Sequence, residues 1–92
     1  MTDKERQLLK SARKGSVAAF EQLIEPYCNR VYNLMLKACN NEFEASQLAQ
    51  EVFIKVFRLV MEGNFESAFA VCIYKTADEI AQQVAGESRM IS

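Results

Sequence analysis

The amino-acid sequence predicts an all-α protein, a compact bundle of three to four helices. Apolar residues recur at three- and four-residue spacing over most of the 92 residues, which is the period of an amphipathic helix. No segment alternates apolar and polar residues as a half-buried strand does, and no hairpin dipeptide joins two apolar runs. With three Gly and one Pro the chain has few breaks, so we expect short connections between the helices.

Length and composition predict a single domain over residues 1–92, in which residues 87–92 are frayed. Half of the residues are hydrophobic and a quarter are charged, a composition typical of folded soluble domains. No apolar run is long enough to cross a membrane, so we expect no membrane partner. The first residues, MTDKERQLLK, resemble a natural start without a signal-peptide core, which favours a cytoplasmic location.

The sequence lacks the residue types that most enzymes and metal sites require. It contains no His, the commonest general base and metal ligand, and no Gly-rich phosphate loop. The cysteines, Cys28, Cys39 and Cys72, form no CxxC pair and lie among apolar residues, which predicts small buried core side chains. We therefore expect no catalytic residues, no metal ligands and no cofactor, and we do not interpret the chain as an enzyme.

Charge is distributed unevenly along the chain, whose net charge is −1. Residues 1–39 carry seven Lys or Arg against four acids, whereas residues 40–63 and 64–92 each carry two against four. A nucleic-acid module of this size more often shows a dense basic face. The charge pattern alone therefore does not indicate DNA binding.

The first helix is predicted to follow Thr2 and to end near Lys14. Thr2 and Glu5 have the spacing of a capping box, and Gly15 follows the last periodic residue. Basic residues gather in the last turns, where cations complement the helix dipole: Lys10, Arg13 and Lys14.

The second helical segment covers residues 17–39, with Ser16 as its N-cap. Pro26 interrupts this segment, because its ring removes one backbone hydrogen bond and crowds the preceding turn. The sequence leaves two alternatives open, a kinked helix or two helices in tandem. Asn40 and Asn41 form the turn that follows.

The central helix is predicted over residues 41–61. Asn41 and Glu44 have capping-box spacing, and Gly63 stands where a left-handed residue ends a helix. The apolar stripe is wide enough to contact several neighbours, which places this helix at the centre of the bundle. The stripe consists of Phe43, Leu48, Val52, Phe53, Val56, Phe57, Leu59 and Val60.

The last helix is predicted to begin after Gly63, with Asn64 and Ser67 as candidate caps and Phe65 as an early apolar residue. Gly86 is predicted to end it. Its buried stripe consists of Phe69, Ile73, Thr76, Ala77, Ile80 and Val84.

Three blocks follow one another along the sequence: KGSVAAFEQLIEPYCNRVYNLML, EASQLAQEVFIKVFRLV and FESAFAVCIYKTA. Together they resemble the second conserved region of bacterial extracytoplasmic-function (ECF) sigma factors. In that family a small-residue turn precedes AFE, and an aromatic pair around an Arg comes next. A D-A-E-D-L-T-Q-E-V-F helix follows, and F-x-x-W-L-Y-R-I-A-R-N comes last. The blocks here have the same order and spacing, and the resemblance covers about residues 5 to 85.

The resemblance implies that the central helix docks on the clamp helices of the RNA polymerase core through the polar face of the D-L-T-Q-E segment. In this chain Gln50 and Glu51 match the segment, whereas Gln47 and Ala49 replace its Asp and Thr. Gln50, Glu51 and the matching Arg30 are the expected polymerase-binding residues. Arg30 has two other interpretations, an ion pair with Glu25 or a contact with a helix end. Gln in place of the Asp predicts weaker docking, because one charge-assisted contact is lost.

The resemblance also implies that the last helix reads a promoter element as single strands, with basic and aromatic side chains. Tyr74 and Lys75 match the pattern and are the expected DNA-binding residues. Cys72 replaces a Trp, whereas Asp78 and Glu79 replace Arg and Asn. Two acids on a face that meets a polyanion oppose DNA binding, because phosphate contacts dominate nucleic-acid affinity.

These observations lead to one leading hypothesis and two alternatives. The leading hypothesis is the polymerase core-binding domain of a sigma factor, active in transcription initiation as part of a larger chain, with promoter contact opposed by the acidic last helix. The first alternative is a stand-alone protein-interaction module that keeps this fold, binds polymerase or an anti-sigma factor, and does not bind DNA. The second is an unrelated bundle that shares only helical amphipathicity with the family.

Overall fold

The computed structural model describes the backbone of residues 2–63 and 68–91, and the side chains of residues 2–63 and 68–86. The described residues form helices and turns without a strand, which confirms the all-α prediction. The elements in chain order are α1 (Asp3–Arg13), α2 (Val17–Ile24), a short 3₁₀ helix η1 (Glu25–Tyr27), α3 (Cys28–Cys39), α4 (Glu42–Glu62) and α5 (Phe69–Ile91). None of the described helices is long and apolar enough to cross a membrane.

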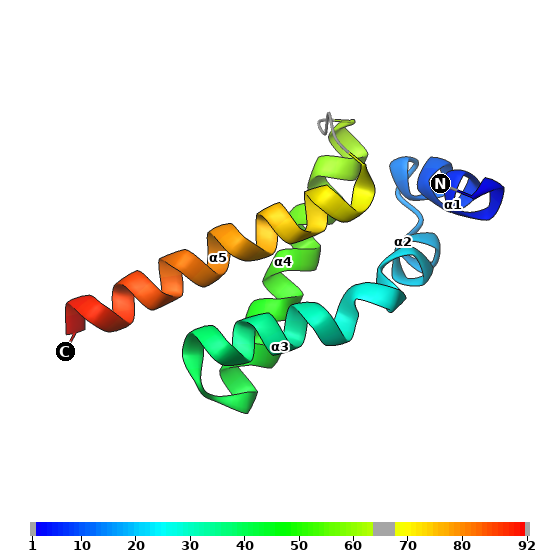
Figure 1. The fold of residues 1–92 in the computed structure, drawn as a ribbon. Helices are drawn as coiled ribbons and strands as arrows, with labels where there is room; N and C mark the ends of the chain where they lie inside the picture. Colours follow the sequence, from blue (N-terminus) through cyan, green and yellow to red (C-terminus); the bar gives the residue numbers. More distant parts are fainter. Residues whose placement is uncertain (1, 64–67, 92) are drawn as a thin grey trace.

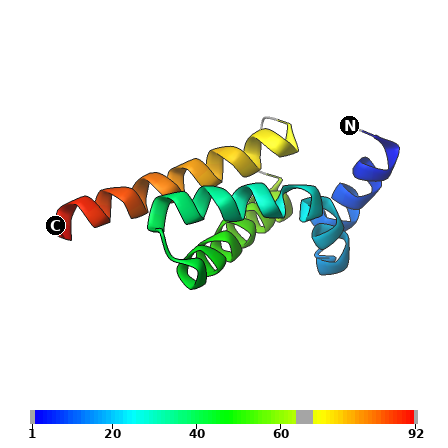
Figure 2. The same ribbon diagram turned by 60° about the horizontal axis from the view of Figure 1, so that its bottom comes forward.

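The bundle has a body of three helices and a smaller helical pair at one end. In Figures 1 and 2, α3 and α5 lie side by side and run in the same direction, whereas α4 packs against both and runs the opposite way. The α1–α2 pair lies at the end of the body where α4 finishes, and α1 contacts α4. The chain measures 47 × 22 × 20 Å, and its termini lie at opposite ends.

Local capping sets the helix ends, as the sequence predicts. The side-chain oxygens of Thr2, Ser16 and Asn41 each accept a hydrogen bond from a backbone N–H three residues later, at 3.2, 3.2 and 2.9 Å. After α4, Gly63 has φ of 67°, a left-handed conformation that costs little without a side chain. Asn40 adopts the same region with φ of 56° between α3 and α4, and Asn tolerates this region better than most residues.

Pro26 divides the second helical segment into two helices. It lies in the 3₁₀ turn between α2 and α3, near the start of that turn, where its missing N–H is least needed. Of the two alternatives that the sequence leaves open, two helices in tandem is therefore the one observed. The break lets α2 pack against α1 while α3 packs against α4 and α5.

The face that α4 turns towards the core differs in part from the predicted stripe. Phe43 is 73% exposed, so its predicted burial is wrong. Phe43 is nine positions from the fully buried Val52, which is about 180° of helix rotation, so the two residues lie on opposite faces. The buried side chains of this helix are Ala45, Ala49, Val52, Val56 and Val60. The two alanines leave room for neighbouring helices to approach closely.

The buried stripe predicted for α5 is largely confirmed. Phe69, Ile73, Thr76, Ala77 and Ile80 are buried, with Val84 half-buried, and Cys72 joins them. Cys28 and Cys39 are half-buried, so full burial of all three cysteines was a wrong prediction.

The prediction that Gly86 ends the last helix is wrong, because α5 continues to Ile91. Gly86 does not adopt the left-handed conformation seen at Gly63, and a helix tolerates an interior glycine at a modest cost in stability. Fraying of residues 87–92 stays a prediction. The candidate caps Asn64 and Ser67, and Phe65, lie outside the described residues.

Candidate functional site

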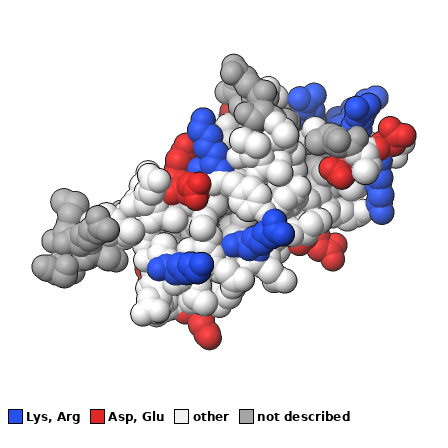
Figure 3. Space-filling view, in the orientation of Figure 1, with Lys and Arg blue, Asp and Glu red and all other residues white. Residues whose placement is uncertain are grey.

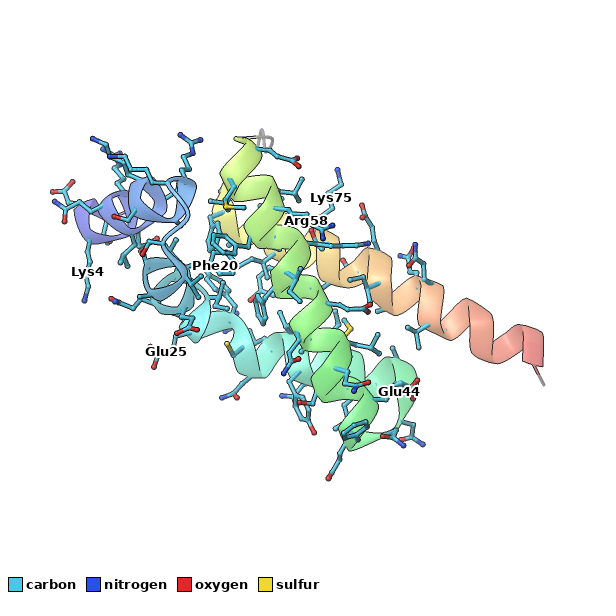
Figure 4. The ribbon with its side chains drawn as sticks, turned by 180° about the vertical axis from the view of Figure 1, so that it is seen from behind. Lys4, Phe20, Glu25, Glu44, Arg58 and Lys75 are labelled. Carbon is cyan, nitrogen blue, oxygen red and sulfur yellow. The ribbon has the colours of Figure 1, made fainter. Side chains whose placement is uncertain are left out.

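One edge of α4 carries the polar residues expected to bind a partner. Gln47, Gln50 and Glu51 are exposed and lie within one turn of each other, on the side opposite the buried stripe. In Figure 4, which views the molecule from behind, α4 faces the reader with Glu44 near its start and Arg58 further along. We call Gln47, Gln50 and Glu51 the α4 edge. Its amides and carboxylate supply both donors and acceptors, and Glu51 adds a negative charge.

Ala49 does not belong to the α4 edge, although it lies between its residues in the sequence. Its side chain is 9% exposed and packs in the core. The change from the family's Thr to Ala therefore alters the interior of the bundle. At the remaining replaced position, Gln47 keeps a polar side chain at the surface but lacks the charge of an Asp.

Arg30 and Tyr74 are brought together across α3 and α5. The Arg30 Nη1 donates a hydrogen bond to the Tyr74 Oη at 3.3 Å, between residues 44 positions apart in the sequence. This bond raises the pKa of the Arg30 guanidinium, a group that is charged at physiological pH even without such a bond. The structure thus places Arg30 beside a residue expected to contact DNA, on a face that α3 and α5 share.

A chain of aromatic rings leads from Tyr74 into the core. Tyr74 meets Tyr27 edge-to-face at 5.9 Å, and Tyr27 meets Phe69 in the same way at 6.2 Å. Phe69 meets Phe20 edge-to-face at 6.4 Å, and Phe20 stacks on Phe57 at 4.5 Å. Edge-to-face and offset-stacked pairs are the favourable aromatic arrangements. The chain ties α2, η1, α4 and α5 together, and no local sequence pattern indicates it.

Tyr74 and Lys75 are neighbours in the sequence but project about 100° apart around α5. Tyr74 is half-buried against Arg30, whereas Lys75 is exposed and appears beside Arg58 in the rear view of Figure 4. Asp78 and Glu79 are both exposed on the same helix. The two residues expected to bind DNA therefore do not form one compact site.

Cys28 and Cys72 are poorly suited to nucleophilic chemistry. Burial raises the pKa of the Cys72 thiol, and burial together with the nearby Glu25 carboxylate raises the pKa of Cys28. Both side chains therefore stay as neutral thiols, which are weak nucleophiles. Cys28 lines a shallow, open hollow beside Glu21 and Glu25 on α2 and η1. Within residues 2–63 and 68–86, no group of three or more His, Cys, Asp or Glu is placed to hold a metal ion.

The helical bundle and the order of the sequence blocks indicate a sigma region 2-like domain, and comparison with known proteins supports this class. The chain is 32% identical over 82 residues to the RNA polymerase sigma-H factor of Pseudomonas aeruginosa. The matched region covers 87% of this chain and 42% of that protein. It is 26% identical over 72 residues to the ECF RNA polymerase sigma factor SigW of Bacillus subtilis, covering 78% of the chain and 38% of the relative.

A third relative is the ECF RNA polymerase sigma factor SigE of Mycolicibacterium smegmatis, with 34% identity over 56 residues, 58% of the chain and 22% of the relative. The chain spans less than half the length of each of these curated relatives. No protein-family model matches it, and no solved structure gives a significant match. The similarities confirm the resemblance to ECF sigma factors and support a region 2-like domain of that type.

Proposed function

We propose that this chain is the RNA polymerase core-binding domain of a sigma factor, acting in transcription initiation in the bacterial cytoplasm as part of a larger chain. Its partner is the pair of clamp helices of the polymerase core, and its docking surface is the α4 edge. The observation that supports this best is that Gln47, Gln50 and Glu51 all point away from the core, on the long helix that the family uses for docking.

The chemistry of the α4 edge suits a basic helical partner. Glu51 is exposed and can accept charge-assisted hydrogen bonds from Arg or Lys, each contributing about 1.5–3 kcal/mol once water is excluded. Gln47 and Gln50 can add neutral hydrogen bonds of about 0.5–1.5 kcal/mol. One carboxylate on this edge, where the family pattern has two, leads us to expect moderate affinity.

Binding of a clamp-helix fragment to a double variant, Gln50→Ala with Glu51→Ala, tests this function. We expect affinity to fall by about tenfold or more, because one charged and one neutral contact are removed. The chain contains a matched control, Glu21 and Gln22, an adjacent exposed pair on α2 with the same two side chains. Calorimetry that finds equal losses for Glu21→Ala with Gln22→Ala and for the α4 variant would reject the α4 edge as the docking surface.

A second candidate function is favoured by the acids of α5. Asp78 and Glu79 are exposed where the family pattern has Arg and Asn. In this alternative, the chain is a stand-alone protein-interaction module that binds polymerase or an anti-sigma factor and does not bind promoter DNA. Clamp binding without any binding of single-stranded DNA is the result expected from this alternative.

A further inference from the structure

Three exposed apolar side chains form a line along the outer face of α4. The large hydrophobic side chains that are exposed among the described residues are Val17, Phe43, Ile54, Met61 and Val71. Phe43 and Met61 are 18 positions apart, which is five full turns, and Ile54 projects within about 20° of both. We call Phe43, Ile54 and Met61 the apolar line. It is about 27 Å long and lies on the side of α4 away from the buried stripe.

The apolar line and the α4 edge share one helical face, which has the spacing of a helix–helix seam. Phe43, Gln47, Gln50 and Ile54 follow one another at intervals of four, three and four positions, and Met61 comes seven positions later. Such intervals place side chains where a second helix packs between them. Single exposed apolar residues are ordinary at a protein surface, whereas a contiguous apolar strip marks an interaction site. A second helix lying along α4 is therefore the shape of partner that this face fits.

The positions on this face are symmetric about Val52. Phe43 lies nine positions before Val52 and Met61 nine positions after it, while Gln50 and Ile54 lie two positions before and after it. Consider a second α4 that runs antiparallel to the first, related to it by a two-fold axis level with Val52. Phe43 of each copy then meets Met61 of the other, and Gln50 of each copy meets Ile54 of the other. Each contact is made twice, as an interface between identical surfaces requires.

The charges beside the apolar line favour this antiparallel direction. Glu44 lies eight positions before Val52 and Arg58 six positions after it, and the two side chains project within about 40° of each other. Both are exposed on α4, which faces the reader in Figure 4. Antiparallel packing brings Glu44 of one copy within about 3 Å, along the axis, of the level of Arg58 of the other. Parallel packing would instead place like charges side by side, and flanking charges set the direction of paired helices.

We infer that this chain self-associates through α4, as a two-fold dimer in which the apolar lines of two copies pack antiparallel and Glu44 pairs with Arg58 twice. The dimer covers Gln47 and Gln50 of the α4 edge, so a paired copy does not bind the clamp helices. The pairing itself does not rest on the proposed function, and only the competition with docking does. Self-association thus withholds the docking surface when the chain is concentrated.

The same geometry limits the strength of the dimer. Glu51 meets its own copy across the axis, although Lys55 of the other copy lies equally close along the axis. Glu62 lies level with Glu44 of the other copy but projects further round the helix from the shared face. A contact of one helix on one helix is small, and interfaces below about 1,200 Å² are typical of weak, transient complexes. We therefore expect a reversible equilibrium between monomer and dimer.

Sedimentation equilibrium over about 1 µM to 1 mM protein tests the dimer, and the native chain should change from monomer to dimer in this range. Ile54→Ala should weaken association by about tenfold or more, because apolar contact is lost from both copies. Val17→Ala is the matched control, since Val17 is 55% exposed on α2 and Ile54 is 56% exposed on α4. This control should change the dissociation constant by less than about twofold.

An exchange of charges tests the register of the two helices. Arg58→Glu and Glu44→Arg should each weaken association by about tenfold or more, because an attractive pair becomes repulsive in two places. An equimolar mixture of the two variants should associate about as strongly as the native chain, since every such contact in the mixed dimer again joins opposite charges. Lys37→Glu on α3 is the control and should leave association nearly unchanged, because basic side chains over α3 lie on the opposite side of the molecule (Figure 3). Far-UV circular dichroism checks that each variant is folded.

Different outcomes refute the two proposals. A native chain that stays monomeric up to about 1 mM, equal losses in Ile54→Ala and Val17→Ala, or a mixture that associates no better than its components would overturn the dimer and leave clamp docking intact. A saturating clamp-helix fragment should convert the dimer into complexes of one chain with one fragment. If the dimer persists with the fragment bound and the charge exchange still restores it, the pairing stands and the α4 edge is not the docking surface. A chain that dimerises but does not bind the fragment refutes the proposed function alone.

Discussion

Two phenylalanine-to-alanine substitutions of identical chemistry should have very different effects on stability. The Phe20 ring is 4% exposed and contacts the rings of Phe57 and Phe69, whereas Phe43 is 73% exposed. Replacing a buried Phe by Ala costs about 3–5 kcal/mol, which includes the cavity and the two lost ring contacts. A domain of this size is stabilised by roughly 5–14 kcal/mol, so Phe20→Ala should remove a large part of the total. Phe43→Ala should change the free energy of unfolding by less than about 0.5 kcal/mol.

Urea denaturation followed by far-UV circular dichroism measures both effects. Because Phe20→Ala risks leaving little folded protein, Phe20→Leu serves as a milder variant that keeps apolar bulk and removes the ring contacts. We expect it to lose about 1–2 kcal/mol. The reasoning is wrong if Phe43→Ala destabilises the protein as much as Phe20→Leu does, because the face that α4 turns inwards would then be misassigned.

Three smaller effects should also be measurable. Asn41→Ala removes the 2.9 Å cap of α4 and should lower stability by about 1 kcal/mol in thermal unfolding, and no loss would show that this cap is dispensable. Gly86→Ala should raise stability by about 0.5–1 kcal/mol, because Gly86 lies inside α5 and a Cβ there meets no atom within 4 Å; a loss would contradict continuation of the helix. Burial raises the pKa of Cys72 above its ordinary value of 9.0, so the thiol loses its proton more readily in the unfolded chain. The contribution of this thiol to the free energy of unfolding should therefore be fully present below that pH and be lost as the pH rises above it. Cys72→Ala should reduce the decrease, and an unchanged pH profile would exclude this thiol as its cause.

The helix positions could be predicted because the signals that start and end them are local. Ser16 and Asn41 each cap a helix within three residues, and Gly63 ends one at its own position. Gly86 shows the limit of this reasoning. A glycine after an apolar stripe ends a helix only where it adopts a left-handed conformation, and Gly86 does not. Its sequence context alone does not distinguish it from Gly63.

The inward face of α4 was harder to predict because a prediction from hydrophobic periodicity gives more weight to large apolar residues than to alanines. Phe43 has a strong hydrophobic signal but lies on the outer face, while Ala45 and Ala49 have weak signals and are buried. Small side chains fit where α3 and α5 pack against α4, and this packing depends on the tertiary structure. The pairing of Arg30 with Tyr74 was beyond sequence reasoning for the same reason, since 44 positions separate the two residues.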